Sequence, residues 1–183
     1  PELQSEFFIG RTKEGFSLNK VMVGYAGWTL ERQMAIDVIP ILADGIKWLG
    51  FLPKQHILWN FGVYTDWLSK GESFSTYKWQ LAARLGWLPI YFPNENRILH
   101  VGLSYRFGEP VNGEIPMRSR PEANPAPYFV STGKFQTSQS NHIGYEVYYS
   151  IGSWMVGSEY YVHKFNAPES GNPSFHGGDV VVS

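Results

Sequence analysis

Residues 98–108, Ile98-Leu-His-Val-Gly-Leu-Ser-Tyr-Arg-Phe-Gly108, alternate between apolar and polar or small side chains at nearly every position. A period of two residues places these two classes on opposite faces of a β-strand. The run is close to the length of about ten residues that a tilted strand needs to cross a bilayer. This stretch therefore predicts a long strand with one apolar face.

The same alternation recurs in several other parts of the chain. Its clearest examples are residues 57–66, 79–87, 142–151 and 154–163. Gly152-Ser153 separates the last two runs and predicts a tight hairpin, and Pro93–Asn96 predicts a short turn before residue 98. Weaker strands are expected at residues 6–11, 113–120 and 175–183. We therefore predict an all-β fold with antiparallel neighbours.

The composition narrows the class of protein. Aromatic residues make up 16% of the 183 residues, and 19 Gly and 12 Pro accompany them, which favours many strands and turns. The net charge of −1 offers no basic surface for nucleic acid. The absence of cysteine excludes thiol nucleophiles, disulfides and thiolate metal sites. The chain contains no run of 18 apolar residues, so no membrane-spanning helix is predicted. The mean hydropathy of −0.23 is compatible with a membrane barrel, because lipid-facing and lumen-facing residues alternate along its strands.

Aromatic side chains gather near the ends of the apolar faces, as in the interfacial girdle of a membrane barrel. They are Trp67, Trp79, Trp87, Tyr105, Phe107 and Trp154. The alternative is a soluble β-sandwich, with these rings in its core or on its surface as a carbohydrate-binding site. Sandwich strands are usually shorter than these runs. The pattern thus favours an antiparallel transmembrane β-barrel, and we expect residues 1–183 to be part of a single barrel domain within a longer protein.

Long and short connections alternate along the predicted strands. The long connections are predicted at residues 17–53, 68–77, 121–141 and 166–173. Residues 17–53 are too long for a plain loop and include residues 29–39, a candidate short helix with Thr29 as N-cap and Pro40 near its end. In a pore, such a segment can fold into the lumen and form the constriction. It can equally be an external loop or a contact with a neighbouring subunit.

If the apolar faces meet lipid, the polar faces line the pore, and four arginines then point inward. They are Arg84, Arg106, Arg118 and Arg120. Arg118 and Arg120 are two residues apart and about 7 Å from each other along a strand, so their guanidinium groups can pass an anion between them. Four acidic residues are also predicted to face inward and can form ion pairs with these arginines instead: Asp66, Glu146, Glu159 and Asp179.

Lys13, Lys20 and Arg32 flank or belong to the first long connection and are candidates for the constriction. Three histidines are best interpreted as polar lumen residues, because no spacing matches a metal site: His100, His142 and His163. No phosphate loop, nucleophile motif or cofactor motif is present. Glu146 and Glu159 can face each other across a hairpin like an acid/base pair, but carboxylates are common on a wet barrel wall. We therefore predict no catalytic site, metal or cofactor.

Four segments together resemble the phosphate-selective porin O and P family. They are Arg11-Thr-Lys-Glu-Gly-Phe-Ser-Leu18, Glu31-Arg-Gln-Met34, Arg118-Ser-Arg-Pro-Glu122 and the hairpin Tyr148-Tyr-Ser…Gly157-Ser-Glu-Tyr160. The resemblance implies a bacterial outer-membrane barrel of about sixteen strands, usually trimeric, that conducts small anions such as phosphate. Seven or eight strands are predicted here, about half of such a barrel. The alternative function is a non-conducting barrel that anchors or tethers another component, its lumen plugged by residues 17–53.

Overall fold

A computed structural model describes residues 3–22, 27, 32–40, 42–72, 76–123 and 125–183. In these residues ten strands follow one another: β1 (Gln4–Lys13), β2 (Leu42–Leu52), β3 (Ile57–Thr65), β4 (Tyr77–Phe92), β5 (Arg97–Pro110), β6 (Glu114–Ser119), β7 (Val130–Gln136), β8 (Gln139–Ile151), β9 (Trp154–Asn166) and β10 (Ser174–Val182). The helical elements are short: α1 (Leu18–Val21) and the 3-10 turns η2 (Met34–Ile36), η3 (Pro93–Glu95) and η4 (Pro168–Ser170). None of the helices in these ranges is long and apolar enough to cross a membrane.

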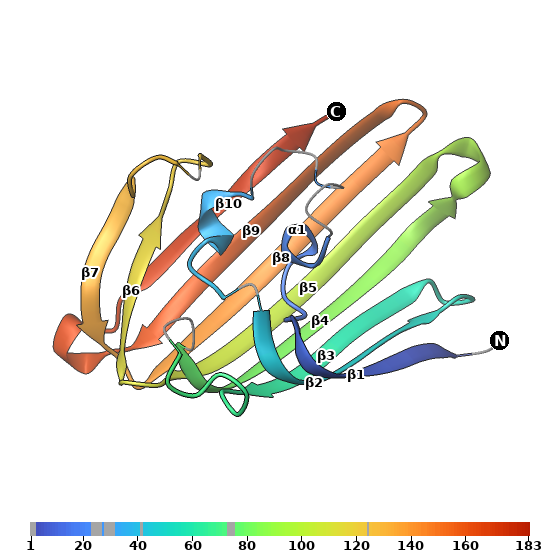
Figure 1. Ribbon diagram of the computed structural model, residues 1–183. Helices are drawn as coiled ribbons and strands as arrows, with labels where there is room; N and C mark the ends of the chain where they lie inside the picture. The colour runs from blue at the N-terminus through green and yellow to red at the C-terminus, as the bar shows by residue number, and fades with distance from the viewer. Residues whose placement is uncertain (1–2, 23–26, 28–31, 41, 73–75, 124) are drawn as a thin grey trace.

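Eight of the strands form one curved antiparallel sheet in the order β1-β2-β3-β4-β5-β8-β9-β10 (Figure 1). Strands β6 and β7 form a separate two-stranded hairpin, so β5 pairs directly with β8. Among the described strands, β1 pairs only with β2 and β10 only with β9. The predicted all-β, antiparallel class is therefore confirmed, and the described sheet is open, with β1 and β10 at its edges.

The strands with clear alternation lie where the sequence predicts them. The run at residues 98–108 falls within β5, which has 14 residues, and the run at residues 79–87 falls within β4, which has 16. Gly152-Ser153 joins β8 to β9, with Gly152 at a φ of 57° that favours glycine. These lengths exceed the five or six residues typical of soluble sheets.

The prediction that residues 17–53 form one long connection is wrong, because β2 occupies Leu42–Leu52. This strand pairs with β1 on one side and β3 on the other. Its burial pattern is irregular, with Ala43, Asp44 and Gly45 all buried in succession between the exposed residues Leu42 and Ile46, so no simple alternation marks the strand. Of the helix predicted at residues 29–39, residues 29–31 including Thr29 lie outside the described residues, and residues 34–36 form the 3-10 turn η2.

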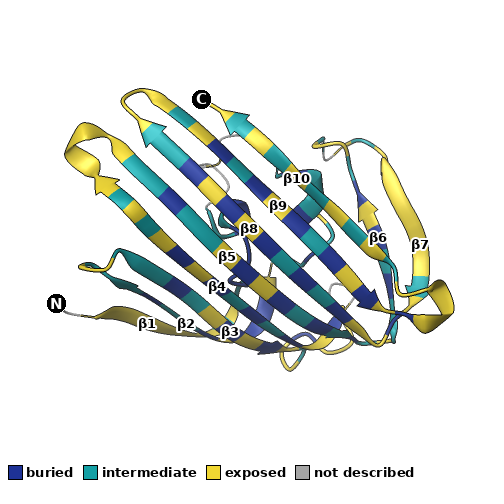
Figure 2. Cartoon of the chain, turned by 180° about the vertical axis from the view of Figure 1, so that it is seen from behind, coloured by how far each residue is buried: buried dark blue, intermediate teal, exposed yellow. Residues whose placement is uncertain are grey.

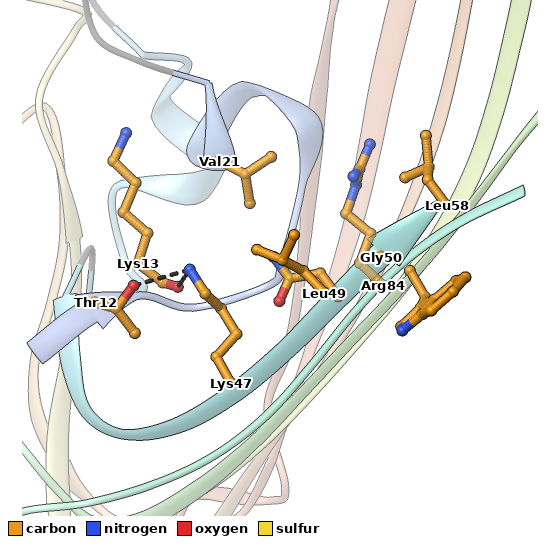
Figure 3. A pocket seen from close by; sticks show the side chains of 10 residues that line it. Thr12, Lys13, Val21, Lys47, Leu49, Gly50, Leu58 and Arg84 are labelled. Carbon is orange, nitrogen blue, oxygen red and sulfur yellow. Dashed lines mark hydrogen bonds between the residues drawn. The ribbon is translucent and has the colours of Figure 1, made fainter. Parts of the chain in front are cut away.

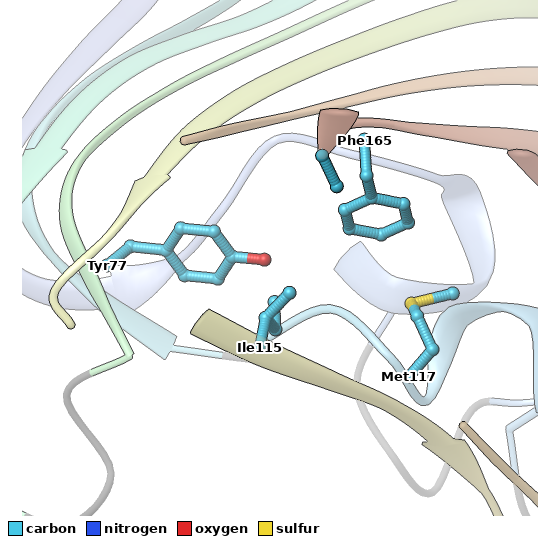
Figure 4. Close-up of a cluster of buried hydrophobic side chains, with 5 residues drawn as sticks. Tyr77, Ile115, Met117 and Phe165 are labelled. Atoms are coloured by element: carbon cyan, nitrogen blue, oxygen red, sulfur yellow. The ribbon is translucent and has the colours of Figure 1, made fainter. Parts of the chain in front are cut away.

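The prediction of a connection at residues 121–141 is also wrong, because it contains β7 and the start of β8. The strand predicted at residues 113–120 forms as β6, but it pairs with β7 and not with the main sheet. Figure 4 shows what holds this hairpin: Ile115 and Met117 of β6 meet Tyr77 and Phe165 of the sheet in a buried apolar cluster. Apolar contact thus replaces strand pairing as the force that fixes the hairpin.

The two faces of the large sheet differ in chemistry. Buried and less buried positions alternate along much of β4, β5, β8 and β9 (Figure 2). One face carries exposed apolar side chains, among them Phe61, Val63, Leu85, Trp87, Leu103, Tyr105, Tyr145, Val147, Val156 and Tyr160. The other face, over which α1 and η2 lie (Figure 1), carries buried polar and charged side chains, among them Lys47, Gln80, Arg84, His100, Arg106, Ser140, His142, Glu146, Glu159 and His163. We call the latter the concave face and the former the convex face.

Tyrosine rings cover glycines of neighbouring strands on the concave face. Tyr148 of β8 is directly opposite Gly157 of β9, and a Cβ atom added to Gly157 would collide with the Tyr148 ring. In the same way, the ring of Tyr161 lies 2.9 Å from the position of an added Cβ on Gly144. Glycine therefore leaves room for each ring against the next strand.

We expect Gly157→Ala to lower the free energy of unfolding by roughly 1–3 kcal/mol, because the new methyl group overpacks a site already filled by the Tyr148 ring. Equilibrium unfolding in denaturant measures this loss. The double variant Gly157→Ala, Tyr148→Ala provides the control, since the two effects should be strongly non-additive if the clash is the cause. Simple additivity would contradict the explanation.

Candidate functional site on the concave face

The chain turns inward after β1 and lies over the middle of the concave face. Ser17 adopts a φ of 67°, and α1 begins directly after it. The carboxylates of two sheet residues accept hydrogen bonds from the first backbone amides of α1: Leu18 N donates to Glu146 Oε2 and Asn19 N to Glu159 Oε1, both at 2.8 Å. These bonds satisfy the free amides at the start of α1 and hold residues 14–22 against the sheet.

Glu14, Lys20 and Arg106 form a fully buried charge cluster beneath this segment. Arg106 Nε donates to Glu14 Oε2 at 2.6 Å, its Nη2 donates to Gln80, and Lys20 Nζ lies 3.5 Å from the same carboxylate oxygen. Burial opposes ionisation of Glu14, but the charges of Arg106 and Lys20 outweigh it and hold the pKa of this carboxyl below its ordinary value. Burial lowers the pKa of Lys20 to about 8, although Glu14 favours its charged form. Arg106 is therefore the principal counter-charge of Glu14.

Arg84 forms the second buried ion pair. Its Nη2 donates to Glu146 Oε1 and its Nε to Glu146 Oε2 at 3.2 Å, in the bidentate arrangement that suits a guanidinium and a carboxylate. The ring Nε2 of His100 lies 2.6 Å from Glu146 Oε1. Arg84 and Arg106, the two predicted arginines on the large sheet, therefore both form ion pairs with carboxylates. From the sequence, ion pairs were the alternative to anion binding in the pore.

Glu146 and Glu159 face each other across the β8–β9 hairpin, as the sequence suggested. Glu159 accepts hydrogen bonds from the hydroxyls of Tyr148, at 2.8 Å, and Tyr161, in addition to the amide of Asn19. Glu146 is bonded to Arg84, His100 and Leu18. Each carboxylate therefore binds both the segment that contains α1 and side chains of the sheet.

His142 and His163 form a buried contact on β8 and β9. Their Nδ1 atoms are 2.7 Å apart, so one ring donates and the other accepts, and His163 Nε2 contacts the carbonyl oxygen of Ala35 at 3.0 Å. In the part of the chain that the structure describes, no group of three or more histidine, cysteine, aspartate or glutamate side chains is placed to hold a metal ion. The pair links the sheet to η2.

A pocket of about 390 Å³ opens on the concave face over strands β1 to β4, beside Val21 of α1 (Figure 3). Lys13, Lys47 and Arg84 contribute its positive charges. Lys47 Nζ donates to Thr12 Oγ1 at 2.8 Å and to the carbonyl oxygen of Lys13, and Lys13 Nζ donates to the carbonyl oxygen of Met22 at 2.5 Å. These acceptors are neutral, and Lys47 Nζ also lies 5.0 Å from the centre of the Phe8 ring. Among the described residues, neither lysine forms an ion pair with a carboxylate.

Lys47 was missed by the sequence analysis, because it lies on β2 within the supposed loop. The signal that could have found it is the apolar run Ile46-Lys-Trp-Leu-Gly-Phe-Leu52, which is rich in strand-forming residues. Of the three predicted constriction residues, Lys20 is buried in the Glu14 cluster, while Lys13 lines the pocket. Arg32 is half-buried and lies near both lysines, whose charges it repels. The structure thus brings the predicted trio together.

The remaining predicted residues lie away from this pocket. Arg118 and Arg120 are on or just after β6, outside the large sheet, and the guanidinium carbons of both lie over the Tyr128 ring, 4.6 and 4.5 Å from its centre. Asp66 follows the end of β3 in a turn and not on a strand face. Asp179 of β10 accepts a hydrogen bond from the backbone amide of Glu159 at 3.1 Å.

No family model matches the chain, and no curated protein matches it either.

Proposed function

We propose that this chain is part of a bacterial outer-membrane β-barrel that acts as a passive diffusion channel for small anions, of the phosphate-selective porin O and P type. The observation that carries the proposal is the division of one long-stranded sheet into an exposed apolar convex face and a polar concave face. A membrane barrel needs this division, because its outer face meets lipid and its inner face meets water.

The convex face is well suited to lipid. Leu103, Tyr145, Val147 and Tyr160 leave about half of their surface exposed near the middle of their strands. Trp154, 68% exposed, stands at a strand end, where an interfacial ring is expected. A soluble monomer rarely exposes apolar side chains over such a broad area. Beside the large sheet, the described strands form only the two-stranded β6–β7 hairpin, which is too small to be the second layer of a carbohydrate-binding sandwich.

The proposal requires further strands. The edges β1 and β10 would leave unpaired backbone groups in lipid, which a membrane barrel avoids by closing on itself. A closed porin-type barrel of about sixteen strands would accommodate the eight-stranded sheet as half of its wall. We propose that other parts of the gene product supply the remainder, and that three copies assemble into a trimer.

Lys13 and Lys47 support selectivity for anions. Arg84 and Arg106 are neutralised by Glu146 and Glu14, so they add little to the field in the lumen. Lys13 and Lys47, by contrast, donate hydrogen bonds to neutral oxygens at the wall of an open pocket, and Lys47 also lies over the Phe8 ring. An oxyanion such as phosphate would gain charge-assisted hydrogen bonds there. The proposed function involves no chemical reaction, cofactor or nucleic acid.

Single-channel recording of the whole gene product in a planar bilayer under a salt gradient tests this function. We expect an anion-selective conductance that phosphate reduces. The variant Lys13→Gln, Lys47→Gln should lose most of the anion preference, a several-fold fall in the anion-to-cation permeability ratio, because it removes two lysine charges that form no ion pair with a carboxylate among the residues that the structure describes.

Lys54→Gln is the matched control, since Lys54 is exposed in the turn between β2 and β3. Its reversal potential should equal that of the unmodified protein. A cation-selective or unselective pore would leave the barrel in place but contradict the anion channel. An unchanged reversal potential in the double lysine variant would reject the assignment of these two residues.

A second candidate function is a plugged barrel that anchors another component. It is favoured by the tight fixing of residues 14–22, whose Phe16 is fully buried against Tyr161 and His142. Absence of conductance from protein that is correctly folded and inserted would select this function over the channel.

A further inference from the structure

A second cavity lies between η2, β6 and β10, on the concave side but apart from the lysine pocket. Its volume is about 340 Å³, within the range of sites that take small ligands. Most of its wall is apolar and comes from Met34, Val38, Met117 and Phe175. Gly177 of β10 lets η2 approach closely, since a Cβ atom added there would lie 3.2 Å from that of Ala35.

One end of this cavity carries a positive charge. Arg118 is exposed and lines the cavity, and its guanidinium stacks on the Tyr128 ring. The same ring holds Arg120, whose Nε donates to the carbonyl oxygen of Ala126 at 3.0 Å. Stacking restricts the orientation of the Arg118 guanidinium while its N–H donors stay free to bind.

Other polar side chains of the cavity wall either form hydrogen bonds within the protein or lie at the rim of the cavity. His163 contacts His142 and the carbonyl oxygen of Ala35 through its two nitrogens. Ser119 Oγ donates to the carbonyl oxygen of Met34 at 2.9 Å. Glu122 is exposed to water, which screens its charge. Arg118 is therefore the group best placed to orient a ligand.

We propose that this cavity binds a small amphipathic carboxylate, an aromatic acid of about the size of benzoate. Its carboxylate would accept two hydrogen bonds from Arg118, and its ring would contact Met34, Met117 and Phe175. Methionine sulfur and phenylalanine both interact favourably with aromatic rings. A fully hydrated ion such as phosphate would gain nothing from these apolar walls. The inference does not depend on conduction, and only its test in nanodiscs rests on the proposed membrane barrel.

Fluorine NMR of 4-fluorobenzoate, titrated into the whole gene product in lipid nanodiscs, tests the site. Empty nanodiscs show how much of the probe enters lipid. We expect saturable line broadening from the protein, an affinity at least about tenfold lower in Arg118→Gln, and an intermediate value in Arg118→Lys, which keeps the charge but loses the planar fork. Arg97→Gln should bind normally, because Arg97 also lies over an aromatic ring, Phe92, but at the far end of β5.

Two further probes separate the apolar and charged contributions. We expect 4-fluorobenzyl alcohol to bind much more weakly, because it lacks the carboxylate, and inorganic phosphate not to displace 4-fluorobenzoate at equal concentration. Broadening no greater than in empty nanodiscs would overturn the proposal. So would equal binding by Arg118→Gln, equal binding of the alcohol, or displacement by phosphate as effective as by benzoate.

Discussion

Replacing Arg106 by methionine is expected to lower the free energy of unfolding by about 3–5 kcal/mol, the loss typical of a buried ion pair from which one partner is removed. Arg106 is fully buried, and it is the closest positive charge to Glu14, at 2.6 Å. Without it, Glu14 keeps only Lys20, at 3.5 Å, and Gln80 loses its donor. Equilibrium unfolding of the whole gene product in guanidinium and lipid bilayers measures the difference.

Arg97→Met is the matched control, because Arg97 lies on the same strand but is exposed, and its loss should change stability by no more than about 0.5 kcal/mol. The triple variant Glu14→Gln, Lys20→Met, Arg106→Met removes all three charges at once. We expect it to be closer to the unmodified protein than Arg106→Met, since it leaves no buried charge unpaired. A loss of less than about 1 kcal/mol in Arg106→Met would show that the cluster is not structural.

Leu103→Arg is expected to cost about 2–4 kcal/mol in a lipid bilayer, the penalty for an arginine on the lipid face near the midplane. Leu103 is in the middle of β5 and is 50% exposed on the convex face. On a surface that meets water, an arginine at such a position would change stability by less than about 0.5 kcal/mol. The substitution therefore distinguishes contact with lipid from contact with water.

Ile151→Arg serves as the control on the same face. Ile151 is similarly exposed, at 49%, but it is the last residue of β8 and would be near the membrane surface. The penalty there should fall to about 0–1 kcal/mol. Equal and small effects of both substitutions would exclude a lipid-facing convex surface, whereas a large difference between them would support it.

Strands were predictable from the sequence where one face is apolar and the other polar. The alternation around Leu103 located β5 to within a few residues. β2 was not predicted, because buried and exposed residues do not alternate along its run Ala43-Asp-Gly45. β6 was located correctly but assigned to the barrel wall, because a period of two residues shows that a strand forms without showing which strand it pairs with. Pairing depends on contacts such as that between Met117 and Phe165, which are distant in sequence.

The candidate site was predictable in part for the same reason. The alternation predicted which face of the sheet carries Arg84 and Arg106, but it did not predict which carboxylates they pair with. Glu14 reaches Arg106 from a segment 92 residues earlier in the chain. Lys47 was recognised as a site residue only from the structure, in which β2 places it beside Thr12. The charged residue types in the sequence identified the candidate residues. The fold was needed to distinguish basic residues that form ion pairs with carboxylates from those that do not.

The direct pairing of β5 with β8 makes the β6–β7 hairpin an insertion between two neighbouring strands. Every pair in the large sheet joins strands that are consecutive in the chain once this insertion is set aside. The entropy of closing a loop grows only slowly with its length, so the insertion costs the sheet little. Evolution could therefore lengthen, shorten or replace residues 111–138, and with them the cavity at Arg118, while the registers between the sheet strands stay as they are.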